Sequence, residues 1–442
     1  MSAQTICTGL IDSEARGLLA RLDQIRPFVM HETMVLAAAL PPRAQWRIEK
    51  FLHTGRNDLR RQIDEFLGWL HADGRHASPE EQQKRFVRIR LQFNVVLSQF
   101  DLFTEVVTQR SEHSTGVWLS GLDALAQDAL RVGVPMAGDV DLVVYLARGA
   151  GAAIRRAHTR LPGGHPNPVG IIRLPRERMI GSGIASSLIH EVGHQGAAQL
   201  DLVRSLRQEI DHRAARTPDA AWGVWSLWIS EIVADLWSVG KVGVTSTLGL
   251  LAVVSLPRYF VFRPTGTDPH PMPYLRVLIS AAIGRSLYPH RQWDELAATW
   301  RAMYPLTGLP AEHVAWIHKC EEEIDDLIDL LLHHRPPAAG GRELGSIWPL
   351  RERQPDRLLR LHADWGNDVG RMARQSPSLV FAVLGQAKAM GLISAQTENA
   401  QLSDLLTAWA VRSSLDTTGR NSQLVRDRRA SAPVSTLSTR RR

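Results

Sequence analysis

The segment Ile189–Gln195, IHEVGHQ, decides what fold and chemistry we expect of this 442-residue chain. His190 and His194 are four residues apart, so on a helix both imidazoles lie on one face and can bind one metal ion. Glu191 lies between them, where its carboxylate can take a proton from water activated by that metal. Apolar residues at a spacing of four predict that a helix over 184–208 carries the segment.

A third metal ligand is expected from the helix predicted over 220–241. An open catalytic zinc site takes three protein ligands and leaves a further position free. Glu231 and Asp235, in the pattern Glu-x-x-Ala-Asp, are also one helical turn apart. Glu231 can complete the ligand set, and Asp235 can hydrogen-bond a ligating imidazole, most plausibly that of His190. Both patterns arise together by chance on the order of once in a thousand such chains.

Together the two patterns resemble the gluzincin-type zinc metallopeptidases, in which His-Glu-x-x-His is followed by Glu-x-x-Ala-Asp. The resemblance covers roughly residues 141–276 and implies that His190, His194 and Glu231 bind Zn²⁺. It also implies that Glu191 is the general base and that Asp235 hydrogen-bonds a metal-binding side chain without binding the metal itself. No His-x-x-Gly-x-x-His continuation follows His194, which excludes the metzincin branch.

The segment DPHPMPYLR, residues 268–276, is similar to the His-Pro…Arg segment that follows the Glu-x-x-Ala-Asp helix in some gluzincins. Hydrolysis creates an oxyanion that a positioned donor can stabilise. His270, Tyr274 and Arg276 are the candidates, and Tyr259 is a weaker one. The competing interpretation is a proline-stiffened loop with a surface histidine.

The remaining pattern predicts a mainly α (α+β) fold. It consists of a zincin-like catalytic domain, with a small β-sheet beside the His-Glu-x-x-His helix, between helical N- and C-terminal regions. In gluzincins the edge strand of such a sheet binds the substrate backbone. We expect a helical N-terminal region at 1–130, the zincin-like domain at 131–334 and a linker at 335–349. A helical C-terminal region at 350–415 and a basic disordered tail at 416–442 follow.

Local patterns refine this organisation. A Ser-Pro-Glu-Glu start at Ser78 and an apolar stripe predict a helix from Pro79 to about Arg110. Short β-branched runs predict strands within 141–149 and 168–175. Residues 152–161 fit either a helix or part of a long hairpin. Further helices are expected over 242–256, 274–288, 292–303, 311–333, 358–373, 378–390 and 402–414, and the loops 161–168 and 263–273 are placed to cover the cleft.

Composition excludes several other classes. The chain is 44% hydrophobic and 22% charged, as in ordinary globular proteins. Two cysteines, Cys7 and Cys320, fit free thiols in a reducing compartment. The net charge is +7, but residues 417–442 hold seven Arg and one Asp, which leaves about +1 for the rest. A DNA-binding body is therefore not expected, whereas the basic tail is open to nucleic acid, an acidic partner or a membrane surface.

The chain shows no pattern typical of export or membrane insertion. Its longest uncharged stretch, 242–256, falls short of the ~20 residues that span a bilayer. No basic segment followed by an apolar run opens the sequence. We therefore expect a cytoplasmic protein, with delivery by a non-classical route left open.

These observations predict a zinc-dependent hydrolase, most directly a metallo-endopeptidase acting on a peptide or protein substrate. Two alternatives stay open. One is a non-catalytic, zinc-stabilised helical interaction protein, for which Glu191 would be unnecessary. The other is zinc-dependent hydrolysis of a bond other than a peptide.

Overall fold

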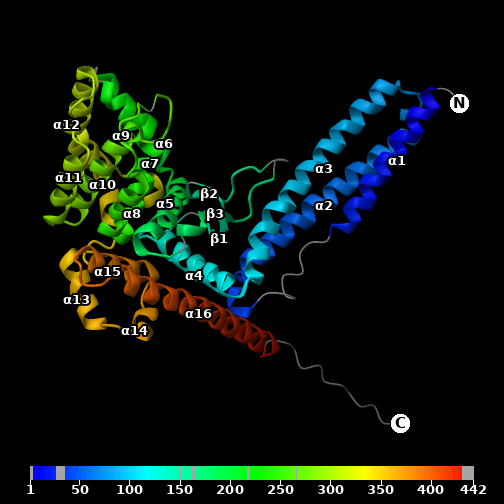
Figure 1. Cartoon of the computed structure of the whole chain (residues 1–442). Helices are drawn as coiled ribbons and strands as arrows, with labels where there is room; N and C mark the ends of the chain where they lie inside the picture. Colours follow the sequence, from blue (N-terminus) through cyan, green and yellow to red (C-terminus); the bar gives the residue numbers. More distant parts are fainter. Residues whose placement is uncertain are drawn as a thin grey trace, which may run out of the picture.

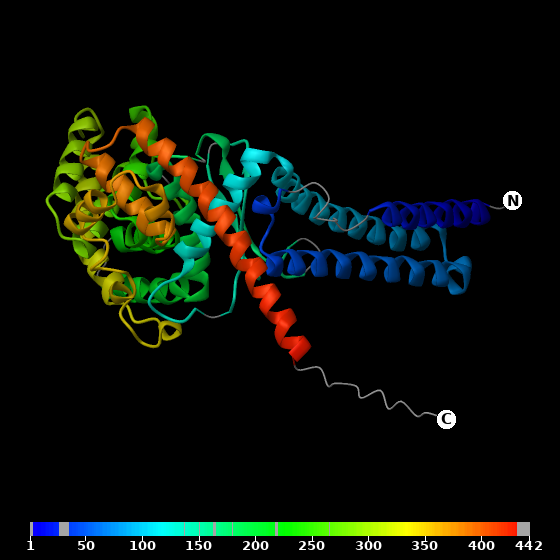
Figure 2. The ribbon, with the colours of Figure 1, turned by 90° about the horizontal axis from the view of Figure 1, so that it is seen from below.

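The expected fold class is confirmed: the chain is mainly helical with one small β-sheet (Figure 1). The computed structural model describes residues 3–25, 35–136, 138–149, 151–161, 165–178, 180–216, 220–264 and 266–430. Three long N-terminal helices form an arm that projects from a larger helical body, and the sheet lies where the arm meets the body (Figures 1 and 2).

The arm consists of α1 (Ala3–Gln24), α2 (Pro42–His71) and α3 (Pro79–Thr108). The helix predicted from Pro79 is confirmed, and the Ser78 side chain caps it by accepting a hydrogen bond from the backbone N–H of Glu81 at 3.2 Å. Short 3₁₀ turns lie at Leu36–Ala38, Asp73–His76 and Gln109–Ser111. Buried apolar side chains from all three helices form a core of their own.

The sheet contains β1 (Leu142–Ala147), β2 (Ala153–Arg155) and β3 (Gly170–Pro175) in the order β1-β3-β2. β1 is parallel to β3, and β2 is antiparallel to β3. Residues 152–161 therefore belong to a hairpin rather than a helix. β2 is an edge strand that pairs on one side only.

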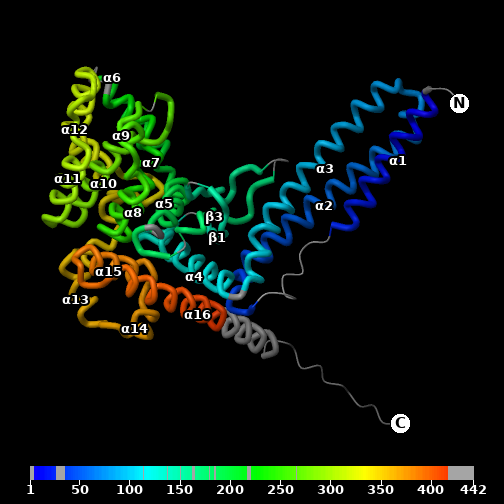
Figure 3. The backbone as a smooth tube through the Cα atoms, viewed as in Figure 1, coloured from blue at the N-terminus to red at the C-terminus, as the bar shows by residue number. Residues whose placement is uncertain are grey.

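The sheet joins two hydrophobic cores because its side chains alternate. Val144 and Ile172 pack into the core of the body, whereas Val143 and Ile171 pack into the core of the arm. Under the sheet lies α4 (His113–Leu130), with the C-terminal helix beside it in the backbone trace (Figure 3).

A buried ion pair ties α4 to β1. Arg110 and Asp123 are almost fully buried and 2.7 Å apart. Arg110 Nη2 donates to the carbonyl of Val144, and the Val144 N–H donates to Asp123 Oδ1, each at 2.7 Å. The pair therefore satisfies both backbone groups of one residue in the middle of the strand.

The body is built around α5 (Ser182–Gln199), α6 (Leu202–Arg216), α7 (Ala220–Val242) and α8 (Val244–Val254). The single helix expected over 184–208 is wrong, because the chain divides into α5 and α6. Asp201 has a φ of +54°. A residue in this left-handed region ends a helix and turns the chain, which here lets α6 pack against α7.

The remaining helices enclose the body and complete the fold. The helix expected over 358–373 is interrupted, because Gly366 has a φ of +55° and ends the first of two helices. These elements are α9 (Arg258–Val261), α10 (Pro273–Leu287), α11 (Gln292–Met303), α12 (Ala311–His333), α13 (Pro355–Trp365), α14 (Val369–Ala373), α15 (Pro377–Ala389) and α16 (Ala395–Ala430).

The segment 335–349, expected as a linker, contains the 3₁₀ turns Pro337–Ala339 and Leu344–Ile347. Leu344 and Trp348 are buried in the same hydrophobic cluster as the helices before and after them. The Trp348 ring packs edge-on against Trp237 of α7, with the ring centroids 5.2 Å apart. The helices before this segment and the C-terminal helices therefore share one core.

The C-terminal end differs from expectation. We predicted disorder from Asp416, but the backbone of α16 stays helical to Ala430. Helix propagation adds one hydrogen bond per ordered residue, so packed earlier turns can extend a helix outward. The rest of the predicted tail, 431–442, lies outside the described residues, as do 162–164 and Thr265 of the two predicted covering loops. No helix of the described part has the length and hydropathy to cross a membrane.

Candidate metal centre

The two helices that carry the predicted ligands touch at a glycine. A Cβ on Gly193 would lie 2.8 Å from the Cβ of Trp237 and 2.9 Å from the Cα of Ala234. Contacts this short leave no room for a side chain, so only glycine allows α5 and α7 to approach so closely. Because Gly193 lies between Glu191 and His194, the close approach falls at the ligands themselves.

His190, His194 and Glu231 converge into a group that could hold a metal ion. Nε2 of His190 lies 3.3 Å from Oε2 of Glu231, and Nε2 of His194 lies 3.4 Å from Oε1. Three tetrahedral ligands at ~2.1 Å from an ion are about 3.4 Å from one another. Each imidazole is about this far from one oxygen of the Glu231 carboxylate, and one ligand atom of each of the three residues lies within 4.8 Å of the others.

Asp235 lies against the first imidazole. Its Oδ1 lies 2.7 Å from Nδ1 of His190, which leaves Nε2 of that ring to face Glu231. Arg276 holds the other side of the carboxylate, donating from Nε to Oδ2 at 2.7 Å and from Nη2 to Oδ1 at 2.9 Å. The second imidazole has a weaker support, since Ser230 Oγ is 3.5 Å from Nδ1 of His194.

The charges of the group hold both carboxylates ionised. Burial acts to raise the pKa of Asp235, but Arg276 and His190 lower it to about 2. Burial likewise acts to raise the pKa of Glu231, but hydrogen bonds from His190 and His194 hold this pKa well below its usual range. Burial acts to lower the pKa of His190, yet the charge of Asp235 and its hydrogen bond raise it to about 10. A metal ion bound at Nε2 of His190 would take the place of the proton on that nitrogen.

Glu191 lies beside the group and lines the same cavity, which has a volume of about 550 Å³. The residue is 8% exposed. Glu191 is not one of the three residues of the candidate metal-binding group. The cavity therefore contains a carboxylate in that group, Glu231, and a second one beside it, Glu191.

The structure brings two of the three residues from the 268–276 segment to the site. His270 lines the cavity with its Nε2 4.0 Å from Oε2 of Glu231, and Asp268 Oδ1 holds its Nδ1 at 2.7 Å. Arg276 also lines the cavity, with Nη2 donating to Glu231 Oε2 at 3.3 Å.

Tyr274 was a wrong candidate for the site. Its hydroxyl donates to Glu321 Oε1 at 2.9 Å, on the far side of α10 from His190, His194 and Glu231, which we call the metal group. Burial and the charge of Glu321 raise the pKa of Tyr274 above its usual value. Residues two apart on a helix point in nearly opposite directions, so Tyr274 and Arg276 cannot face the same site. Tyr259 is 75% exposed, packs against Phe260 and does not line the cavity.

Sequence reasoning missed one wall of the cavity. α8 passes close to α5 at Gly249, where an added Cβ would clash with the carbonyl of Gly183. The spacing of small residues along 246–249 was the available signal, but it has no specific meaning without a partner helix. The added lining residues from α5, α7 and α8 are Ser186, Ser187, Ser238, Ser246, Gly249, Leu250 and Val253.

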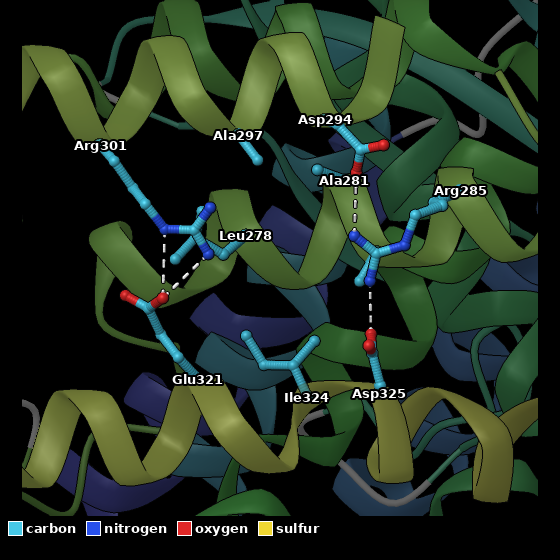
Figure 4. A pocket seen from close by; sticks show the side chains of 10 residues that line it. Leu278, Ala281, Arg285, Asp294, Ala297, Arg301, Glu321, Ile324 and Asp325 are labelled. Atoms are coloured by element: carbon cyan, nitrogen blue, oxygen red, sulfur yellow. Dashed lines mark hydrogen bonds and ion pairs between the residues drawn. The ribbon is translucent and has the colours of Figure 1, made fainter. Parts of the chain in front are cut away.

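A second cavity of about 240 Å³ lies between α10, α11 and α12 (Figure 4). In it Arg285 bridges Asp294 and Asp325, and Arg301 pairs with Glu321. Each of these charged groups already has a partner, and no histidine or cysteine lines the space. This cavity offers no comparable set of ligands.

None of the protein-family models matches this chain, nor does any curated protein or solved structure.

Proposed function

We propose that the chain is a zinc-dependent hydrolase that cleaves peptide bonds, a metallo-endopeptidase of the gluzincin type. One observation carries the proposal: Glu191 lies in the same open cavity as the group of His190, His194 and Glu231. Two imidazoles and one carboxylate form a donor set that suits Zn²⁺ and leaves a position free for substrate. A zinc site that only stabilised the fold would be closed and would not need Glu191.

The roles of the protein side chains follow from their contacts. A zinc ion here would supply a Lewis acid that polarises a substrate carbonyl and makes an attacking water more acidic. Glu191 takes the proton at its carboxylate and delivers it to the departing amine. Asp235 keeps the proton of His190 on Nδ1, so that Nε2 stays available as a ligand.

His270 and Arg276 remain as donors to the oxyanion. Both line the cavity, and each approaches Oε2 of Glu231, His270 at 4.0 Å and Arg276 at 3.3 Å. Donors fixed before the reaction stabilise developing charge without further reorganisation. The His270 side chain is exposed, whereas Arg276 is partly buried and bound to two carboxylates.

The test compares the wild-type chain with Glu191→Gln and Glu231→Gln. Metal content is measured by inductively coupled plasma mass spectrometry, and cleavage is measured on a quenched-fluorescent peptide library. We expect Glu191→Gln to keep one zinc per chain while its cleavage rate falls by about 10²- to 10⁴-fold. We expect Glu231→Gln to lose zinc and activity together, and Glu321→Gln, a carboxylate on the other side of α10, to keep both.

Two outcomes would overturn the proposal. A Glu191→Gln chain that cleaves at the wild-type rate would show that Glu191 is not the general base. A zinc-loaded wild-type chain that cleaves no member of the library would instead support the non-catalytic zinc protein.

A further inference from the structure

The cavity has a wall rich in arginine that the mechanism does not use. Between residues 148 and 178 the chain holds seven arginines and a single acidic residue, Glu177. Two of these arginines, Arg156 and Arg178, line the cavity beside the metal group. The third arginine of the cavity, Arg276, is already paired with Asp235 and Glu231.

The position of Arg156 is fixed relative to the metal ligands. The backbone N–H of Ala157, the next residue, donates to Oε1 of Gln195 at 2.8 Å. Gln195 directly follows His194 on α5. The buried Asn167 side chain also donates to the carbonyl of Arg156 at 3.2 Å. These bonds tie the backbone around Arg156 to α5 one residue after His194, while the Arg156 side chain stays exposed.

Arg178 comes from a different segment of the chain that also lines the cavity. It closes the 3₁₀ turn Arg176–Arg178, which follows β3 and precedes α5. Its side chain is 14% exposed, and its Nε lies 3.2 Å from Oε1 of Glu177. Glu177 is itself 66% exposed, so water screens this pair.

Part of the edge strand β2 also lines the cavity. Among the described residues β2 pairs only with β3, and residues 151–154 belong to the cavity lining. An extended peptide can add to a strand edge through main-chain hydrogen bonds, which leaves its side chains to be read by the neighbouring residues. An edge strand at this place favours a peptide over a nucleic acid as the occupant.

We infer that the cleft selects peptides with acidic side chains near the bond presented to the metal group, and that Arg156 and Arg178 bind those carboxylates. The inference rests on the proposed function for the cleavage step only. A guanidinium binds a carboxylate through two parallel N–H groups, which gives geometric specificity as well as charge attraction. The occupant is thus an acidic segment in extended conformation.

The binding test uses the full-length, zinc-loaded Glu191→Gln chain, so that peptides are held without being cleaved. Fluorescence anisotropy compares a labelled glutamate-containing peptide with its glutamine counterpart. We expect the acidic peptide to bind about tenfold more tightly, and Arg156→Gln or Arg178→Gln each to weaken it about three- to tenfold. The difference between the two peptides should shrink as salt is added.

Matched controls come from the same segment. Arg155→Gln removes the same charge one residue away, and Arg176→Gln does so two residues from Arg178. Neither Arg155 nor Arg176 lines the cavity, and both are exposed. We expect both controls to bind the acidic peptide as the parent does. Equal losses in the controls would show general charge attraction and would overturn the inference.

A cleavage experiment separates this inference from the proposed function. The wild-type chain is given the peptide library, and cleaved sites are mapped by mass spectrometry. Cleavage without enrichment of Asp or Glu near the cut overturns the inference but leaves the hydrolase intact. No cleavage, together with acidic-peptide binding that depends on Arg156, overturns the hydrolase but supports the binding specificity. Oligothymidylate binding that depends on Arg156 and Arg178, with no preference for the acidic peptide, would assign the wall to nucleic acid instead.

Discussion

Nδ1 of His190 lies 2.7 Å from Oδ1 of Asp235, although 45 residues separate the two in the chain. The bond decides which nitrogen of the ring faces Glu231. Because Arg276 holds the other carboxylate oxygen at 2.7 Å, the orientation of the first ligand depends on three helices, α5, α7 and α10. The geometry of the metal group therefore depends on how these helices pack as much as on one sequence motif.

We expect Asp235→Asn to lower zinc affinity about 10- to 100-fold, because the amide cannot supply the charge that supports the His190 proton. The variant also frees Arg276 to compete for Glu231. The dissociation constant is measured by titration against a competing chelator. Asp294→Asn, an exposed carboxylate in the second cavity, is the control, and an unchanged affinity in Asp235→Asn would show that the bond has no role in metal binding.

Gly193→Ala should separate the two ligand helices. Its Cβ would meet Trp237 and Ala234 at 2.8 and 2.9 Å, and backbone cannot move aside cheaply. We expect unfolding free energy to fall by about 2 kcal/mol or more, with weaker zinc binding. Gly223→Ala is the matched control, since nothing lies within 4 Å of its added Cβ.

In Gly223→Ala the higher helix propensity of alanine should raise stability by about 0.5–1 kcal/mol. Urea unfolding and chelator titration measure both variants. A Gly193→Ala chain as stable and as well metallated as the parent would refute the close-approach argument.

Arg110→Met should be among the most destabilising single changes in the chain. It leaves the buried carboxylate of Asp123 without its guanidinium, and burial already acts to raise the pKa of Asp123. We expect a loss of about 3–5 kcal/mol in the free energy of unfolding. Arg176→Met, with a side chain 57% exposed, should change it by less than about 1 kcal/mol.

The double variant Arg110→Met/Asp123→Leu distinguishes an unpaired charge from lost packing. It should recover part of the stability, because no charge stays buried, although the Val144 N–H then lacks its acceptor. A double variant less stable than Arg110→Met alone would contradict this explanation.

The metal-free protein should lose stability as pH rises through the range in which His190 titrates. The pKa of His190 is about 10 when folded and 6.5 in the absence of such contacts. A folded pKa above the unfolded one contributes stability that is complete below pH 6.5 and lost between pH 6.5 and 10. We expect this loss to be on the order of 2–4 kcal/mol, measured by urea unfolding with a chelator present.

His190→Gln is the comparison for the pH experiment. It cannot bind the proton, so its stability should change less over the same range. Identical pH dependence in the two metal-free chains would show that the His190–Asp235 pair does not couple folding to protonation.

Several helices followed from local signals alone. Ser78, Pro79 and Glu81 started α3 as predicted because an N-cap needs only its own first turn. The single helices predicted over 184–208 and 358–373 are each interrupted, the first at Asp201 and the second at Gly366, where φ is positive. The apolar spacing continues through both residues, so it could not indicate these breaks. The two alternatives for 152–161 were separated only by strand pairing with β3.

The candidate metal ligands could be named from residue spacing, since the spacing of four in His190–His194 and in Glu231–Asp235 places each pair on one helical face. The packing of the helices was needed to show that Glu231 faces both imidazoles, that Arg276 supports Asp235 and that Tyr274 turns away toward Glu321. Periodicity gives the directions of side chains within one helix only. The relative position of two helices depends on what their contact surfaces allow, and here a missing Cβ at Gly193 sets it.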